Sequence, residues 1–333
     1  MSAMSLVSCL VLLVLHAAGA QTDLESDHRG LDTMMEEVLV VGKQPGPPMW
    51  KVSKGDHELW IFGTLSPLPK GMIWESNKVE DVIAQSQEFL TPPGVRAGGG
   101  YNPFRLFGIV RTAISLSKNP DGETLEEVLS EDLYSRFSTL KARYVPRDKK
   151  IEKMRPSRAA QTLFNHAIAG EGLTNDVGVI NTLSKLLKRN KGITTTDTMI
   201  EVISKKTELD KFTRDIEGVS LEKEITCFET TIKSIENDLE GMKSRANSWA
   251  LGYADELRRH DYPDRGDDCG QIFADLESLG GLIQQSKDKW LTAAEQALAN
   301  NQTTFAELPI SNIIRPDGLL EQLRTRGYEI KEP

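Results

Sequence analysis

The histidines of this sequence are few, and their positions do not suggest metal or acid–base chemistry. Beyond residue 20 the histidines are His28, His57, His166 and His260, and no two of them have the spacing of a ligand pair. The His57-Glu58 pair does not open a His-Glu-x-x-His motif, because an isoleucine occupies the last position. His166 lies among apolar residues at helical spacing, which is more typical of a packed histidine than of a ligand. The histidines therefore predict no metal site.

Ser66 is the clearest candidate nucleophile, and its neighbours argue against that role. A serine on a strand-to-helix elbow requires Gly-x-Ser-x-Gly, since the tight turn leaves no room for a larger side chain two positions on. Here Pro67 and Leu68 follow, and no histidine is evidently committed as the base. The glycines at 98–100 do not form a phosphate-binding loop either, because no Gly-Lys-Ser/Thr follows them.

Two of the three cysteines, Cys227 and Cys269, lie in the body of the chain, and the third is Cys9. In an oxidising compartment Cys227 and Cys269 could form a disulfide. The alternative is two unpaired thiols in unrelated places, and the sequence alone does not decide between them.

The composition is that of a globular protein with an acidic surface. The chain has 333 residues, of which 39% are hydrophobic and 27% charged, and its formal net charge is -9. This length can bury a substantial core in one large domain or in two modest ones. Binding to nucleic acid requires a basic face that neutralises phosphates, so the acidic balance argues against a nucleic-acid partner.

The first twenty residues have the features of a bacterial signal peptide. An apolar run at 6–15 is about ten residues long, which is too short to span a bilayer. Ala18-Gly19-Ala20 then offers the small-x-small pattern that predicts cleavage after Ala20. A buried apolar helix is the alternative interpretation. We therefore predict a periplasmic or secreted protein with no transmembrane span after cleavage.

Strands are predicted near the start of the remaining chain. Residues 21–48 are a polar stretch ending in Pro and Gly, which predicts a flexible linker. The β-prone runs 49–52 and 58–62 predict a hairpin with the five-residue loop 53–57. A helix is expected over 75–87 and a short buried strand over 88–90. Asn102-Pro103 is a favourable helix start, because proline at the first helical position loses no hydrogen bond.

The middle of the chain, about 103–302, is predicted to be helical. Its clearest apolar stripe runs from Leu221 to Leu239 in steps of three and four residues. The stripe spans fewer than three heptads, so it is more typical of a core-facing helix than of a coiled-coil surface. After a helix over 283–298, we expect a strand at 305–308, a loop, a helix over 318–326 with Gly327 as its C-cap, and a last strand at 328–330.

Two segments resemble the TraB/GumN family. The first runs from Trp50 through Gly63-Thr64-Leu65-Ser66 and resembles the aromatic-rich hairpin that leads into the family's Gly-Thr-x-His motif. The second runs from Phe305 to Tyr328 and is similar to the closing segment, where a strand ends in Gly-x-x-His before a Gly-Leu helix and a Gly-Tyr turn. The resemblance covers roughly residues 49–330.

The resemblance implies an α/β (α+β) fold, with a small central sheet built from both ends of a domain at 49–331 and a large helical insert between them. It also implies that the two Gly-x-x-His segments lie at adjacent strand ends. Eukaryotic members of the family are described as metal-dependent proteases that use those histidines and an acidic residue. Two imidazoles and a carboxylate suit a divalent transition metal, which acidifies a bound water.

At the corresponding positions this sequence departs from the family pattern. Ser66 occupies the first histidine position and, counting back from Asp317-Gly318, Asn312 occupies the second. Thr91 stands where the acidic residue is expected. Hydroxyl and carboxamide groups are weak ligands for zinc, and hard cations generally require carboxylates. We therefore predict that the chain binds no metal and no other cofactor.

Three functional hypotheses follow. The first is a cell-envelope pseudoenzyme that acts as a binding or scaffolding protein for a polar ligand, a peptide or another protein. The second is a hydrolase or peptidase with a rearranged site, with a divalent metal as an alternative cofactor. The third is a helical interaction module that uses the Leu221–Leu239 stripe, and an oligomer is compatible with all three. The residues nominated for the binding site are Gly63, Thr64, Ser66, Thr91, Asn312 and Asp317, and those for the hydrolase are Ser66, Glu58, Asn312 and Asp317.

Overall fold

The structure, a computed structural model, describes residues 46–97, 117–119, 122–175, 178–202, 206–259, 269–270, 272, 276–277 and 280–333. The predicted signal peptide, nearly all of the predicted linker and the predicted helix start at 102–103 lie outside these residues.

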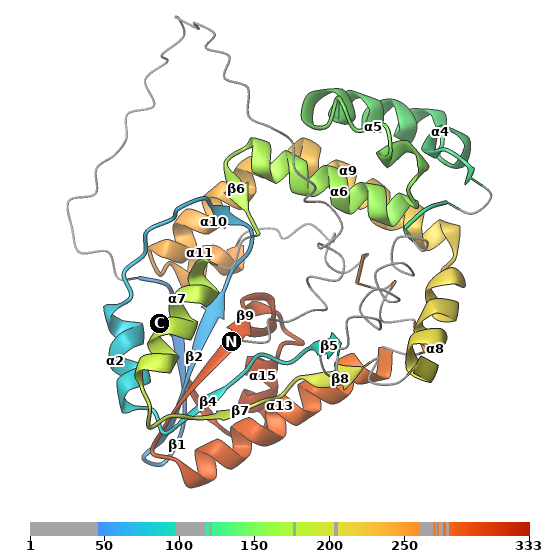
Figure 1. Ribbon diagram of the computed structural model, residues 1–333. Helices are drawn as coiled ribbons and strands as arrows, with labels where there is room; N and C mark the ends of the chain where they lie inside the picture. Colours follow the sequence, from blue (N-terminus) through green and yellow to red (C-terminus); the bar gives the residue numbers. More distant parts are fainter. Residues whose placement is uncertain are drawn as a thin grey trace, which may run out of the picture.

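A six-stranded sheet with the order β10-β1-β2-β9-β4-β7 organises the fold (Figure 1). The two ends of the family-like region supply most of its strands, as predicted. The strands are β1 (Met49–Lys54), β2 (His57–Thr64), β4 (Glu88–Leu90), β7 (Thr194–Thr196), β9 (Thr303–Pro309) and β10 (Glu329–Lys331). Smaller two-stranded pairs are formed by β3 (Leu68–Pro69) with β6 (Leu173–Thr174) and by β5 (Val95–Ala97) with β8 (Ile200–Val202).

The predicted hairpin is present, but its turn is tighter than expected. Strands β1 and β2 pair as far as Lys54 and His57, so that Gly55 and Asp56 alone make the turn instead of the five residues predicted. Gly55 has a φ of +65°, a conformation that glycine adopts without steric cost. The last strand is confirmed as well, because β10 pairs antiparallel with β1.

The middle of the sheet is parallel. Strand β9 runs parallel to β2 on one side and to β4 on the other, and β7 adds to β4 in the same direction. The middle of the chain was predicted to be overwhelmingly helical, and that prediction missed the short strands β6, β7 and β8, which lie inside this region. Since the carboxyl ends of parallel strands meet at one edge, the segments after β2, β4, β7 and β9 emerge together.

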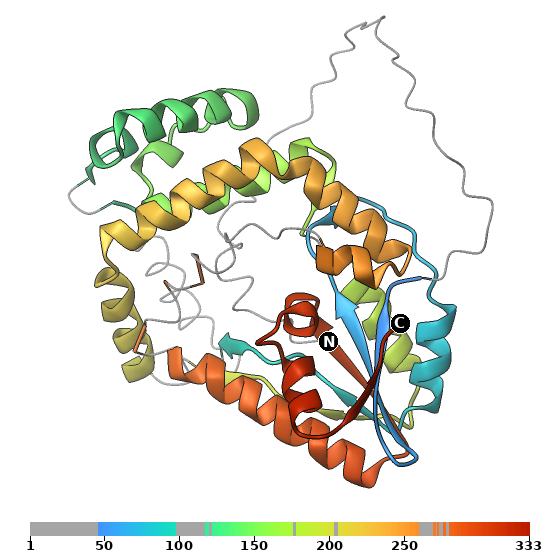
Figure 2. The same cartoon turned by 180° about the vertical axis from the view of Figure 1, so that it is seen from behind.

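Helices cover both faces of this sheet. In Figures 1 and 2, α2 and α7 lie along one face and α13 and α15 along the other. Helix α14 follows β9 where a loop was predicted. The helices that surround the sheet are α2 (Asn77–Gln85), α7 (Gly178–Arg189), α10 (Leu239–Ala250), α11 (Ala254–Arg259), α13 (Gly280–Asn300), α14 (Ser311–Ile314) and α15 (Leu319–Thr325).

A second hydrophobic core lies among the helices at the far end of the molecule. Its helices are α4 (Leu125–Val128), α5 (Glu131–Tyr144), a 3-10 turn (Ile151–Lys153), α6 (Pro156–Gly170) and α9 (Leu221–Asn237), and α8 (Lys206–Glu217) lies between it and α13. Helices α6 and α9 lie side by side (Figures 1 and 2). The structure joins Cys227 on α9 to Cys269 in a disulfide.

The apolar stripe of α9 is part of this second core. Phe228 and Ile232 are fully buried, and Ile235 and Leu239 are nearly so, whereas Leu221 is exposed. The core-facing interpretation of the stripe is therefore confirmed, and the helical interaction module loses the surface on which it was based.

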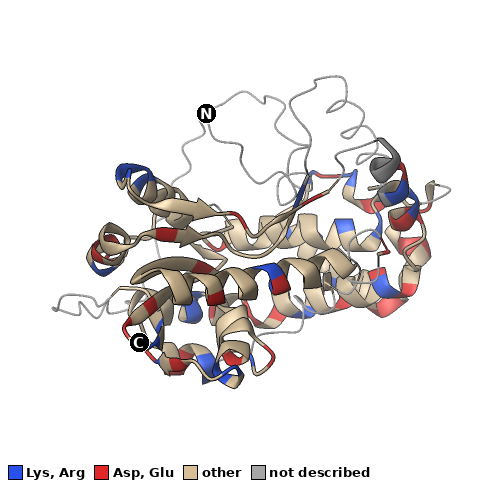
Figure 3. Cartoon of the chain, turned by 90° about the horizontal axis from the view of Figure 1, so that it is seen from below, with Lys and Arg blue, Asp and Glu red and all other residues tan. Residues whose placement is uncertain are grey.

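Basic and acidic residues are interspersed along the outer helices, while the strands of the sheet contain few of them (Figure 3). None of the helices in the described part of the chain is both long and apolar enough to cross a bilayer.

Candidate functional site

The carboxyl edge of the parallel strands brings together the positions that sequence analysis singled out. Strand β2 ends opposite the end of β9, with Thr64 paired to Pro309, and β4 pairs with β9 as far as Leu90 and Ala306. Ser66 follows β2, Thr91 follows β4, and Asn312 lies in α14 just after β9. The two motif segments thus end on neighbouring strands, as the family resemblance implied.

At Gly63 the side chains of neighbouring residues approach the backbone of β2 closely. A Cβ atom at Gly63 would lie 2.7 Å from Cδ1 of Ile310 and 2.9 Å from the Trp50 ring, so only glycine fits without displacement of these neighbours. The buried indole N–H of Trp249 donates a 2.7 Å hydrogen bond to the Gly63 carbonyl oxygen. Helix α10 is thereby tied to the end of β2.

Ser66 is exposed, and its hydroxyl begins a chain of hydrogen bonds that continues through two asparagine amides. Its Oγ atom donates a 2.9 Å hydrogen bond to Oδ1 of Asn175, and Nδ2 of Asn175 donates a 3.4 Å bond to Oδ1 of Asn165 on α6. The partner of the hydroxyl is therefore an amide and not an imidazole base. Nearby, the Thr64 hydroxyl donates a 3.3 Å bond to the carbonyl oxygen of Leu308 across the strand pair.

Thr91 is locked to Thr198, a residue that sequence analysis did not nominate. The Thr91 Oγ1 atom accepts a 2.9 Å hydrogen bond from the Thr198 backbone N–H, and the Thr198 hydroxyl donates a 2.8 Å bond to the Thr91 carbonyl oxygen. Thr198 is completely buried, so its hydroxyl requires such a partner. This reciprocal pair joins the segments that leave β4 and β7.

Asn312 and Asp317 face different surroundings. Asn312 is half-buried in α14, and its carbonyl oxygen lies so close to Gly318 that a Cβ there would approach it to 2.6 Å. Asp317 is exposed and accepts a 3.1 Å hydrogen bond from Nε of Arg315, which lowers the pKa of the carboxyl. The structure shows no contact between Asp317 and Ser66.

Glu58 lies at the wrong end of its strand for a site at this edge. It stands near the start of β2, six residues before Thr64, which at about 3.3 Å per residue is a separation of roughly 20 Å. Its carboxylate accepts hydrogen bonds from Lys51 and from the Trp60 indole, at 2.7 and 3.0 Å. The nomination of Glu58 for hydrolytic chemistry was therefore wrong.

Among the described residues, Glu307 is an acidic group that lies near this edge. It lies in β9 directly across from Phe62 of β2, and it is 7% exposed. Side chains alternate along a strand, so Glu307 shares one face with Phe305 of β9 and Phe89 of β4, whose rings stack with centroids 6.0 Å apart. Thr91 comes two residues after Phe89, so the alternation places it on the same face. Thr64 comes two residues after Phe62, the partner of Glu307, and therefore lies on that face as well.

The surroundings of Glu307 are aromatic rather than polar. Phe62 contacts Trp74 and Trp249 with ring centroids 5.7 and 6.1 Å apart. Among the described residues no side chain makes a hydrogen bond or ion pair with the Glu307 carboxyl, and burial raises its pKa to about 7. A carboxyl with a strongly raised pKa at the end of a central strand has the properties of a functional group.

The side chains at the edge do not match the donor set of a divalent transition metal. Within the described ranges no three His, Cys, Asp or Glu side chains lie close enough together to hold a metal ion. The three motif positions themselves present two hydroxyls and one carboxamide.

Comparison with known proteins identifies the family of the chain. The model of the TraB/PrgY/gumN family matches residues 48–332, which is most of the chain. The chain belongs to the TraB/PrgY/gumN family. No curated protein and no solved structure matches the chain significantly.

The raised pKa of Glu307 predicts a specific pH dependence of folding stability. A carboxyl whose folded-state pKa is about 7, against an ordinary value of 4.5, favours the folded state only while it is protonated. Its contribution is complete below about pH 4.5 and is lost as the pH rises to about 7. Because 2.5 pKa units correspond to roughly 3 kcal/mol, Glu307→Gln should raise the free energy of unfolding at pH 8 by up to about that amount.

Urea unfolding between pH 5 and pH 8 measures this difference. The matched control is Glu329→Gln, at an exposed carboxyl on β10, which should leave the pH profile unchanged. A Glu307→Gln profile parallel to that of the unaltered protein would contradict the assignment.

Proposed function

We propose that this TraB/PrgY/gumN protein is a cell-envelope binding or scaffolding protein that holds a polar ligand or a peptide at the carboxyl edge of its sheet, without a catalytic metal. The observation that carries the proposal is the parallel pairing of β2, β9 and β4, after whose ends lie Ser66, Asn312 and Thr91, the positions that the family resemblance implies for the metal ligands. These side chains donate and accept hydrogen bonds at neutral pH but do not ionise water.

The hydrogen bonds at this edge support the proposal. Ser66 and Asn175 present a hydroxyl and an amide on the exposed side, where a ligand's carbonyl and N–H groups can exchange with them. The Thr91–Thr198 pair is already satisfied internally and holds the neighbouring strand ends together. A site of this kind combines a rigid frame with a few exposed polar groups, and such groups set the orientation of a ligand.

Metal content tests the proposal directly. Protein purified without a metal-binding tag should contain zinc, manganese and cobalt well below one equivalent by elemental analysis. As a positive control, the triple variant Ser66→His, Thr91→Glu, Asn312→His restores the family's ligand types at adjacent strand ends and should take up zinc from a buffered solution.

One transition metal per molecule in the unaltered protein, lost in the double variant Ser66→Ala, Asn312→Ala, would refute the proposal. The binding role itself is probed by saturation-transfer NMR with capped tripeptides. Their signals should weaken several-fold in that double variant and persist in Ser135→Ala, which removes an exposed serine on α5 far from the sheet.

A hydrolase is the second candidate, and Glu307 is the observation that favours it. A buried carboxyl with a pKa of about 7 is suited to act as a general acid or base at neutral pH. Ser66 would then serve as the nucleophile or would orient the substrate from the neighbouring strand end. Under the binding proposal we expect no turnover above background in a peptidase and esterase screen at pH 6 to 8.

The hydrolase would replace our proposal if turnover appeared and was abolished by both Ser66→Ala and Glu307→Gln. Ser135→Ala must leave that turnover unchanged, because a loss in this variant as well would point to a contaminating enzyme.

The proposed place in the cell envelope requires export, which we propose occurs through a signal peptide. The apolar run at 6–15 and the Ala18-Gly19-Ala20 pattern support it, and the Cys227–Cys269 disulfide suits an oxidising compartment. In fractionated bacterial cells the protein should appear in the periplasm or the medium with Gln21 as its first residue, as N-terminal mass spectrometry would show. Ala20→Asp should block this cleavage and leave a longer, cell-associated form. A cytoplasmic protein with an intact N-terminus would contradict export.

A further inference from the structure

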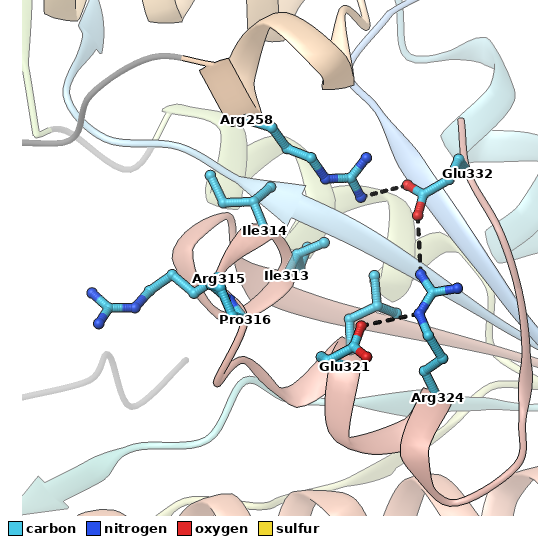
Figure 4. A pocket seen from close by; sticks show the side chains of 9 residues that line it. Arg258, Ile313, Ile314, Arg315, Pro316, Glu321, Arg324 and Glu332 are labelled. Atoms are coloured by element: carbon cyan, nitrogen blue, oxygen red, sulfur yellow. Dashed lines mark hydrogen bonds and ion pairs between the residues drawn. The ribbon is translucent and has the colours of Figure 1, made fainter.

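A cavity of about 450 Å³ lies beside the carboxyl edge of the sheet, between α11, α14, α15 and the segment after β10 (Figure 4). One wall is apolar and comes from α14, α15 and the turn between them. The other wall carries two guanidinium groups and two carboxylates. The lining residues are Arg258, Ile313, Ile314, Arg315, Pro316, Leu320, Glu321, Arg324 and Glu332.

The carboxylate of Glu332 lies at the charged end of the cavity and is bound by three side chains. Arg258 and Arg324 converge on Glu332 from two different helices, with nitrogen–oxygen distances of 2.6 and 3.3 Å (Figure 4). The Trp50 indole N–H donates a third bond to the same carboxylate at 2.6 Å. Arg315 points away from this group in the figure. Two guanidiniums and an indole N–H form a strong receptor for one carboxylate, because each provides N–H donors and the arginines also neutralise its charge.

The site around the Glu332 carboxylate is exposed to solvent, so another anion can reach its two arginines. The side chains of Arg258, Arg324 and Glu332 are 32%, 46% and 41% exposed. Ion pairs with this much solvent contact contribute little net stability, so another anion can compete for the same arginines. Arg324 is also paired with Glu321 at 3.0 Å, and Arg315 is paired with Asp317, which does not line the cavity, at 3.1 Å, so each arginine of the lining already has an acidic partner. Adding a second anion is therefore unfavourable, but exchanging one carboxylate for another keeps the charges balanced.

The size and the apolar wall of the cavity define the rest of the ligand. Glu332 occupies only the charged end, next to Arg258 and Arg324, and Ile313, Ile314 and Leu320 line the remaining space. Cavities of this volume accept small organic molecules. We propose that the cavity binds a small carboxylate with an apolar body, whose carboxylate replaces Glu332 between Arg258 and Arg324. The site does not depend on Ser66, Thr91 or Asn312, none of which lines it.

Calorimetric titration with N-acetyl-leucine tests the exchange. Glu332→Gln keeps an oxygen for the Trp50 indole and removes the competing charge, so it should bind the probe about ten-fold more tightly than the unaltered protein, because a tethered competitor acts at a millimolar effective concentration. Adding Arg324→Gln to this variant should remove the gain. Adding Arg326→Gln instead should not, because Arg326 is paired with Glu295 outside the cavity.

The neutral analogue N-acetyl-leucinamide and inorganic phosphate separate the alternatives. The amide should not bind, and phosphate should bind more weakly, since it lacks the apolar body. Equal binding of the amide, or no gain in Glu332→Gln, would overturn the proposal. Tighter binding of phosphate than of N-acetyl-leucine would replace the carboxylate ligand with a phosphate one.

A readout on the unaltered chain covers the case in which the variants do not fold. The Trp50 indole N–H signal, assigned by comparison with Trp50→Phe, should shift as N-acetyl-leucine displaces Glu332 and should stay in place with the amide. No shift at saturating N-acetyl-leucine would also overturn the proposal.

Discussion

The parallel pairing of β2 with β9 is the constraint on which the rest of the structure depends. It joins segments more than two hundred residues apart, from Glu58 with Thr303 at one end to Thr64 with Pro309 at the other. Closing such a long loop has a large entropic cost, which burial of Phe62, Phe305 and Leu308 offsets. Because of this pairing, β4 adds to the free side of β9, and the three segments that carry the motif positions emerge at one edge.

The sequence predicted the ends of the domain better than its middle. The β1–β2 hairpin and β9 contain runs of apolar and aromatic residues that can be recognised without a structure. Strand β7 is different, because Thr194-Thr195-Thr196 is short, polar and mostly exposed, and only its pairing with β4 makes it a strand. Side-chain pattern alone carries no information about a partner that lies more than a hundred residues away.

The same limit explains what was predicted at the candidate site. Counting along the family motifs placed Ser66, Thr91 and Asn312 at strand ends, because strand ends follow from the apolar runs before them. Glu58 was nominated for its type alone, although its place at the start of β2 puts it at the opposite edge. Glu307 was missed because an acidic residue in a strand is normally expected to face solvent, and only the sheet and the helices around it bury this one.

Two buried glutamates show how the surroundings of a carboxyl decide whether its charge stabilises the fold. Glu224, 2% exposed on α9, accepts hydrogen bonds from the Arg155 guanidinium and from Ser157, so its charge holds α6 against α9. Glu307 is nearly as buried but has no such partner among the described residues, and its ionisation opposes folding. Selection for stability alone would favour glutamine or an apolar side chain at this position. Because this carboxyl shares a sheet face with Thr64 and Thr91, the protonation state of Glu307 sets the charge at that edge of the sheet.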